Sequence, residues 1–531
     1  MRRYAAMVGI VATGAMALAG GGGRVSGEPP AKQIVLTPLG VYRTLLNDKA
    51  AAEIAAYDPA TRRVFSVNVE LRRIDVLDIS DPANPFLAST IDVTPFGHHA
   101  NSVAVHDGII GVAIQAEVKT DPGKAAFFDA DGNLLAAVTA GALPDMITFT
   151  PNGRFALVAN EGEPNDAYTV DPQGTISLID LTGGVNALTD ADVTSIDFTA
   201  FNGAALDPSV RVFGPGASVA QDLEPEYIAV SHDSRTAWVT LQENNAIAIV
   251  DLSERRVTRV VGLGFKDHTA PGNGLDASDQ GGAINITNWP LWGMYQPDAI
   301  AAFEYRGRTY LATANEGDVR EYAGFPGGVE SARVNSLTLD PIAFPNAAAL
   351  KANTALGRLN VTKSLGDPDR DGDFDQLFAF GARSFSIRDA QAGLLFDSGD
   401  ALERVTAAAS PANFNASNTN NTLKNRSDDK GPEPEGIRAA ALFGRTYLFI
   451  ALERIGGIAV YEVVNPAAPT FVQYINTRNF AAATTTVAAG DLGPEGVIVI
   501  PADDSPTGQP LLVIANEVSG TIRIFGISQA K

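Results

Sequence analysis

The stretch LEPEYIAVSHDSRTAWVTLQENNAIAIVDL, residues 223 to 252, decides the fold because its design recurs along most of the chain. Glu226 opens a short apolar run, a turn leads to a second run at 236–241, and a third run follows Glu243. Short runs with alternating apolar residues and turn residues between them are typical of antiparallel strands. A tight turn returns the chain to the end it left, so Glu226 and Glu243 should lie at the same rim of a sheet.

This unit occurs seven times, and every copy has a glutamate at the end of its second strand. These glutamates are Glu70, Glu117, Glu161, Glu243, Glu316, Glu453 and Glu517. Five copies also open on an acid, and these acids are Asp145, Glu226, Asp298, Glu435 and Glu495. Asn101 holds the opening position in another copy, and Ala52 beside Glu53 holds it in the first. The repeat therefore carries two rows of acidic positions.

Seven copies predict an all-β fold, a seven-bladed β-propeller, because radial repetition of small sheets leaves only short, protected edges. A β-solenoid is the main rival, but its repeats are shorter and contain no hairpin with internal turns. An eight-bladed count stays open. We expect one domain over residues 34–528, in which strand 34–43 joins the last blade beside strand 521–527. The two acidic rows should then meet at one mouth of a central channel.

Three insertions interrupt the repeat, at about 182–221, 264–293 and 319–430. Loops of that length usually carry function or lack fixed structure. Within the longest, FDQLFAFGARSFSI (374–387) and GLLFDSG (393–399) are expected to be the outer strands of the fifth blade, delivered late. The Asn-rich segment 409–431 is expected to be a mobile surface loop.

The first residues, MRRYAAMVGIVATGAMALAG, combine two arginines, an apolar stretch and small residues, which is the pattern of a secretory signal peptide over 1–19. Residues 20–33 are expected to be a flexible lead-in. No cysteine stands near Gly20 for lipid attachment, and the last residues show no sorting signal. We therefore expect a protein that is secreted or periplasmic, without a transmembrane segment.

The chain has 531 residues, no cysteine and a formal net charge of −22. The absence of cysteine excludes disulfides, thiolate metal sites and cysteine nucleophiles. So acidic a protein repels nucleic acid and attracts cations. We expect a monomer whose partner is an unidentified surface or small-molecule ligand, and no nucleic-acid partner.

The acidic rows are the first candidate site. Many carboxylates at one rim repel one another unless cations, amide donors or protons relieve them, and calcium takes carboxylate oxygens readily. All twelve acids of the two rows are therefore candidate metal ligands, with calcium as the first choice and other divalent metals as alternatives. The structural alternative is that each glutamate accepts backbone N–H bonds and fixes a turn between blades.

The segment GDPDRDGDFDQLF is a second candidate. Its acids Asp367, Asp369, Asp371, Asp373 and Asp375 fall at the spacing of the first half of a calcium loop, with Gly372 at the sixth place. Phe378 stands where a bidentate glutamate is expected, and no flanking helices are evident. The alternative is a solvated acidic turn.

Basic residues are few near the acidic rows. Lys266 and Arg454 are the possible anion clamps, and His98, His99 and His268 could reach the channel mouth. Isolated loop histidines are more often solvent-exposed than catalytic. No motif for a covalent nucleophile, a P-loop or a dinucleotide site is present, so no catalytic residue is assigned.

The motifs LVANEGEPNDAY, YLATANEGDVREY, DDKGPEPEG and LLVIANEVSGTI resemble the bacterial choice-of-anchor I family, which is related to mesenchyme-specific cell surface glycoproteins. The resemblance covers about residues 34 to 528. It implies a seven-bladed propeller of the YVTN/WD40-like class that is exported and often tethered. Some relatives carry an alkaline phosphatase label, and G-P-E-G is similar to a motif of esterase-like phytase propellers.

Two function classes follow. The first is a calcium-supported, non-enzymatic propeller that presents its rim to a ligand. The second is a metal-dependent phosphomonoesterase, in which channel-mouth calcium binds phosphate and activates water. Its candidate ligands are Glu161, Glu226, Glu243, Glu316, Glu435 and Glu495. Because phosphate sites commonly use arginine, the scarcity of basic residues favours the first class.

Overall fold

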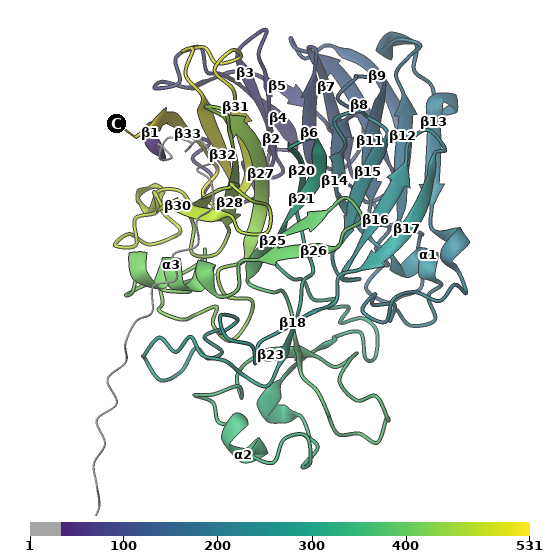
Figure 1. Ribbon diagram of the computed structural model, residues 1–531. Coiled ribbons are helices and arrows are strands. Elements are labelled where there is room, and N and C mark those ends of the chain that lie inside the picture. The colour runs from purple at the N-terminus through teal and green to yellow at the C-terminus, as the bar shows by residue number, and fades with distance from the viewer. Residues whose placement is uncertain (1–32, 531) are drawn as a thin grey trace, which may run out of the picture.

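The computed structural model describes residues 33–530, and the predicted signal peptide and nearly all of the lead-in lie outside them. Within this range the fold is all-β with few helices, and eight separate sheets form (Figure 1). Seven of these sheets have four antiparallel strands each, and the eighth has five short strands.

The first four sheets follow the chain strictly. They are β2 (Ala55–Asp58), β3 (Arg63–Asn68), β4 (Arg73–Asp78) and β5 (Phe86–Asp92); β6 (Ala100–His106), β7 (Ile109–Ile114), β8 (Pro122–Asp129) and β9 (Leu134–Ala142); β10 (Pro144–Phe149), β11 (Phe155–Asn160), β12 (Thr175–Asp180) and β13 (Val193–Asp197); and β14 (Pro225–Val230), β15 (Thr236–Leu241), β16 (Ala246–Asp251) and β17 (Arg256–Gly262). Insertion 182–221 therefore contains β13, the outer strand of its sheet, together with η1 (Val185–Ala187), η2 (Asp190–Asp192), η3 (Thr199–Phe201) and α1 (Val219–Asp222).

Of the other three four-stranded sheets, two combine segments that are distant in the sequence, and the one from β27 to β30 follows the chain. They are β20 (Ile300–Tyr305), β21 (Arg308–Asn315), β25 (Ser384–Asp389) and β26 (Leu394–Asp397); β27 (Pro434–Leu442), β28 (Arg445–Leu452), β29 (Ile458–Glu462) and β30 (Thr470–Ile475); and β31 (Pro494–Ile500), β32 (Leu511–Asn516), β33 (Thr521–Gln529) and β1 (Ile34–Arg43). Two predictions are confirmed. The strands β25 and β26, in segments 374–387 and 393–399, complete a sheet begun at β20, and β1 pairs with β33. The short strand β24 (Phe378–Ala379), earlier in the first segment, joins the five-stranded sheet instead.

The first strands of successive sheets pack side by side from β2 through β6, β10, β14, β20, β27 and β31, and β31 packs against β2. This radial order is that of a β-propeller. The burial of the strands follows from this radial order, because each inner strand lies between two neighbouring sheets. The second strand β15 is almost wholly buried, whereas the outer strand β5 is mostly exposed.

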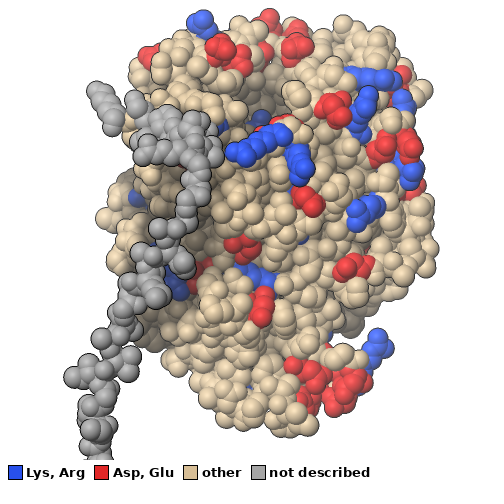
Figure 2. Space-filling model, in the orientation of Figure 1, with Lys and Arg blue, Asp and Glu red and all other residues tan. Residues whose placement is uncertain are grey.

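The five-stranded sheet consists of β18 (Phe265–Asp267), β19 (Trp292–Met294), β24 (Phe378–Ala379), β23 (Asn360–Thr362) and β22 (Ser331–Arg333). It belongs to the insertions, together with η4 (Val334–Ser336), α2 (Ala347–Leu350) and α3 (Ala401–Ala409); η5 (Val487–Ala489) precedes β31. Figure 1 places α2 and β23 below the propeller sheets. Figure 2 shows charged side chains scattered over one face, with a group of acids at this lower end.

The expectation of a mobile surface loop at 409–431 is wrong. Phe414, Asn415 and Ser427 are fully buried, and Asn418 and Lys430 are nearly so. Asparagine and serine side chains in this segment form hydrogen bonds with buried polar groups of the protein. The segment therefore packs as an internal element beside the channel.

Candidate functional site

A cavity of about 270 Å³ lies at one end of the channel, where second strands end and first strands begin. We call it the acidic cavity. Its lining contains nine carboxyl groups, two cations and one amide: Asp145, Glu161, Glu226, Asp298, Glu316, Asp318, Glu435, Glu453, Glu495, Lys430, Arg454 and Gln242. Both predicted acidic rows contribute, so the structure brings most of them together as expected.

Local backbone geometry explains why the opening acids point into the channel. The antiparallel register shifts between Pro225 and Ile228, and the shifted segment contains Glu226. A corresponding register shift in each of three other sheets contains Asp145, Glu435 or Glu495. Proline lacks a backbone donor, and a β-bulge re-aims the side chain it contains. The sequence P-[DE] at the start of a strand thus directs a carboxylate toward the axis.

Two cations neutralise one side of the acidic cavity. Lys430 Nζ lies 2.6 Å from Glu316 Oε1 and 3.3 Å from Glu433 Oε2. Arg454 Nε lies 2.9 Å from Glu433 Oε2 and 2.8 Å from Glu453 Oε2. Burial opposes ionisation of Glu433, but Lys430, Arg454 and Arg426 outweigh it and hold the pKa of Glu433 below its ordinary value. This side of the cavity is therefore a closed ionic network.

The other side is short of positive charge. The Oε2 atoms of Glu53, Glu243 and Glu435 are buried and have no hydrogen-bond partner among the described residues. Burial, reinforced by neighbouring carboxylates, raises the pKa of Asp145 to about 7 and that of Glu243 to about 8. Burial also raises the pKa of Glu435, with Glu453 and Glu495 adding to the effect. Buried acceptors without donors are costly, so this side favours a cation or bound protons.

Two sets of carboxylate oxygens at the acidic cavity lie close enough together to be candidate metal positions. Asp298, Glu316 and Glu435 each offer an oxygen within 4.8 Å of the others. Glu316, Glu433 and Glu453 do the same, but both Lys430 and Arg454 pair with that set, whereas of these two only Lys430 pairs with the first one, through Glu316. Carboxylate oxygens without nitrogen or sulfur ligands suit hard cations such as calcium. The triad of Asp298, Glu316 and Glu435 is therefore the best cation position in the cavity.

Three predicted residues lie elsewhere. Glu70 and Glu117 are exposed outside the cavity, where they pair with Lys49 and Arg72. Lys266 is buried in β18, 3.0 Å from Asp397 Oδ1, and donates to the carbonyls of Ala382 and Gly399. Lys266 therefore cannot clamp an anion at the channel mouth, because its charge is already compensated inside the protein. Arg454 does line the cavity.

Glu517 is close to the acidic cavity without lining it. Its charge acts on Glu53 and Glu495, and burial raises the pKa of all three groups. His268 is buried, and burial together with Lys266 lowers its pKa to about 3, so it is neutral. It does not reach the cavity lining.

The predicted calcium loop folds into two carboxylate groups, one of Asp367, Asp369 and Asp371 and one of Asp340, Asp373 and Asp375. Oδ2 of Asp367 accepts a hydrogen bond from the amide of Gly372, and Oδ1 is shielded without a partner among the described residues. Asp340 reaches this loop from 27 residues or more upstream. The spacing of the loop could not have identified it.

The sequence patterns did not point to Lys430 and Asp318, which line the acidic cavity, or to Glu433, which pairs with Lys430 and Arg454. Lys430 and Glu433 stand in DDKGPEPEG, and Asp318 stands two residues after Glu316 in NEGD. The repetition of N-E-G-[ED] at 160–163 and 315–318 was the available signal, because Glu163 also acts on Asp145 and Glu161. No sequence pattern pointed to Asn418, whose side-chain amide donates a hydrogen bond to Glu453.

Among the residues that the structure describes, no helix is long and apolar enough to span a bilayer. Similar solved structures include hydrazine synthase of Kuenenia stuttgartiensis, with 13% identity, a TM-score of 0.47, and coverage of 91% of this chain and 97% of the other. The WD40 domain of Toxoplasma gondii coronin is 8% identical, with a TM-score of 0.48 and coverage of 95% and 88%.

Two relatives match in sequence. Gigasin-3a of Magallana gigas is 30% identical over 195 residues, which are 34% of this chain and 67% of that protein. The mesenchyme-specific cell surface glycoprotein of Strongylocentrotus purpuratus is 28% identical over 295 residues, which are 50% of this chain but only 37% of that protein. The choice-of-anchor I domain matches residues 53–466, which include all nine acids of the cavity except Glu495. This chain belongs to the choice-of-anchor I domain family.

Proposed function

We propose that this protein is an exported, surface-associated binding module whose propeller requires a divalent cation, calcium first, in the acidic cavity. Each four-stranded sheet then serves as one blade, which gives seven. The name of the cell-surface relative and the family match support a surface role. The pattern of residues 1–19 supports export.

One observation carries the cation proposal. Glu435 presents a buried Oε2 without a donor, and its neighbours Asp298 and Glu316 place oxygens within 4.8 Å of it. A cation there would satisfy Glu435 and reduce the repulsion among acids from several sheets. It would thereby tie β20, β21 and β27 together at the channel mouth, since the three ligands stand next to these strands.

Isothermal titration of calcium into chelator-treated protein tests this proposal. Glu435→Gln keeps the size of the side chain and should abolish the tightest binding event. Glu70→Gln, an exposed glutamate outside the cavity, is the matched control and should bind like the parent. Asp371→Asn separates any binding by the 367–375 loop. Unchanged calcium binding in Glu435→Gln would refute the cavity site.

One observation supports the alternative function, a metal-dependent phosphomonoesterase. Lys430 lines the acidic cavity beside Arg454, so two cations rather than one stand near the candidate metal ligands. Both are already paired with carboxylates, which weakens their hold on phosphate. Release of phosphate from p-nitrophenyl phosphate or phytate that requires calcium and is lost in Glu435→Gln would establish the enzyme.

A further inference from the structure

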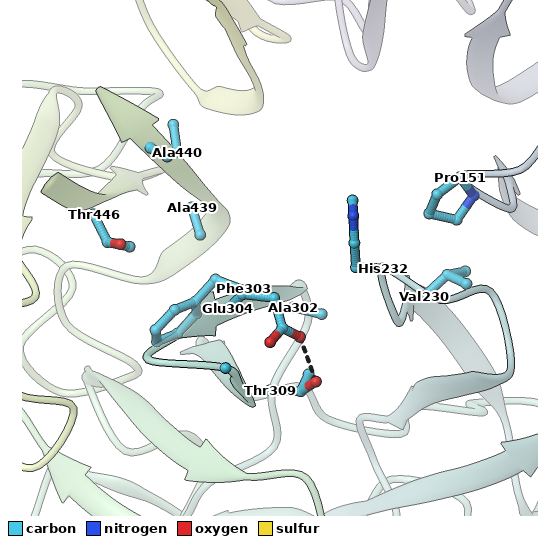
Figure 3. A pocket seen from close by; sticks show the side chains of 12 residues that line it. Pro151, Val230, His232, Ala302, Phe303, Glu304, Thr309, Ala439, Ala440 and Thr446 are labelled. Atoms are coloured by element: carbon cyan, nitrogen blue, oxygen red, sulfur yellow. Dashed lines mark hydrogen bonds between the residues drawn. The ribbon is translucent and has the colours of Figure 1, made fainter. Parts of the chain in front are cut away.

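The opposite end of the channel has a different chemistry. Two cavities of about 370 and 660 Å³ open there, between the first strands and the turns that follow them. The larger cavity is lined mainly by apolar side chains, whereas the smaller one combines apolar side chains with polar groups that include Arg438 and Asp504. Figure 3 shows the larger one, where Ala302, Ala439 and Ala440 surround an open space and Glu304 turns to Thr309. Apolar cavities of this size with a few polar groups are typical of small-ligand sites.

Arg438 is the one lysine or arginine among the described residues that line either cavity. It stands on β27, directly before the alanines at 439–441 that line the larger cavity. Its side chain is exposed, and no described residue forms an ion pair or hydrogen bond with its guanidinium. Asp504 lines the same cavity but forms no ion pair with Arg438, so the guanidinium is a ready partner for one anion.

Tyr227 stands beside this cation and separates the two ends of the channel. It lines the 370 Å³ cavity together with Arg438, and it also lines a chamber of about 40 Å³ that contains Asp145, Asp298 and Glu495. Burial raises the pKa of the Tyr227 hydroxyl to about 12, against a smaller opposing effect of Arg438. The hydroxyl is therefore protonated at neutral pH and can donate a hydrogen bond.

We propose that this mouth binds an apolar monocarboxylate, whose head group pairs with Arg438 and accepts a hydrogen bond from Tyr227. The hydrocarbon part lies against the small side chains of the first strands. A neutral ligand would gain no ion pair with Arg438, and a cationic ligand would be repelled by it.

Decanoate, decanol and decyltrimethylammonium, titrated separately into the full protein, test this assignment. Decanoate should bind one site per chain, and decanol should bind about tenfold or more weakly, because a charge-assisted hydrogen bond is lost. Arg438→Gln should weaken decanoate by a similar factor. Arg259→Gln, an exposed arginine on the outer strand β17, should bind decanoate like the parent.

Equal binding of decanoate and decanol would overturn the proposal, and so would unchanged decanoate binding in Arg438→Gln. Absence of decanoate binding up to its micelle concentration would do the same. Titration in chelator and in Glu435→Gln keeps the result separate from the acidic cavity, because decanoate binding should persist in both. Thermal unfolding followed by circular dichroism shows that Arg438→Gln is folded.

Discussion

At the scale of single residues, Lys430 decides how the acidic cavity is balanced. Its ammonium group is nearly buried and lies within 4.0 Å of Glu316, Asp318 and Glu433. Glu433 also forms ion pairs with Arg426 and Arg454. Besides Lys430, the partner of the Glu316 carboxylate among the described residues is the side-chain amide of Gln242, which donates a hydrogen bond to it. Lys430 thus acts as a tethered cation that competes with a metal ion for Glu316.

Lys430→Gln should destabilise the calcium-free protein by about 3–5 kcal/mol, because breaking a buried ion pair leaves a charge without its partner. Calcium should restore much of this loss, since Glu316 becomes available to the metal. Urea unfolding with calcium and with chelator measures both effects. Lys363→Gln, at an exposed lysine, is the control. Equal stability of Lys430→Gln and parent in chelator would contradict the proposed role.

At the scale of elements, glycine sets the spacing between first strands. Gly436 follows Glu435 on β27, and a Cβ there would lie 2.0 Å from the carbonyl oxygen of Glu495 on β31. Gly496 follows Glu495 and would meet the carbonyl oxygen of Glu53 at 2.8 Å. The motif P-E-G therefore does two things at once: the bulge aims the acid inward, and the glycine lets the next strand approach.

Gly436→Ala should lower the free energy of unfolding by about 1–3 kcal/mol, the usual cost of inserting a methyl group into a packed site. It should also weaken calcium binding, because β27 must move away from β31 and carries Glu435 with it. Denaturant unfolding and calorimetric titration measure the two effects. Gly183→Ala is the matched control, since a Cβ there meets nothing within 4 Å. Loss of stability equal to that in Gly183→Ala would exclude the close approach as a constraint.

At the scale of the whole molecule, the acids from several sheets make stability depend on pH. Burial first, and like charges second, raises the pKa of Asp145 to about 7 and that of Glu243 to about 8. Burial raises the pKa of Glu453 to about 8 and that of Asp318 to about 6, although Arg454 and Lys430 oppose these shifts. Raised values mean that the folded protein holds protons that the unfolded chain releases.

The stability contributed by these protons is fully present below about pH 4, where the unfolded acids are also protonated, and is lost as the pH rises through 6 to 8. Calcium-free protein should therefore melt at a lower temperature at pH 8.5 than at pH 5.5. Calcium should raise the melting temperature more at pH 8.5, because bound metal replaces the protons. Thermal melts at both pH values, with calcium or chelator, check this. A calcium-free protein that is more stable at pH 8.5 would contradict it.

Sequence patterns alone predicted the repeat, the β-propeller class, late strands within 374–387 and 393–399, and the pairing of strand 34–43 with strand 521–527. These features depend on period-two patterns and on copies of one unit, which are local and visible in any single stretch. The convergence of the acidic rows also followed, because antiparallel hairpins return to the rim they leave. It failed for Glu70 and Glu117, which stand two and three residues beyond the ends of β3 and β7 and pair with surface cations. Glu161, Glu316 and Glu453, which line the cavity, directly follow the ends of their strands.

Only the tertiary structure decided which charges neutralise one another. Lys430 pairs with Glu316, which is 114 residues away in the sequence, and the path of the long insertion determines that pairing. The Asn-rich segment 409–431 has the composition of a surface loop, yet it is buried because its amides satisfy carboxylates and carbonyls beside the channel. Lys266 likewise does not line the cavity, because a segment distant in sequence supplies its partner Asp397 inside the protein. Composition and spacing describe what a segment contains, whereas burial and ion pairing depend on what other segments bring to it.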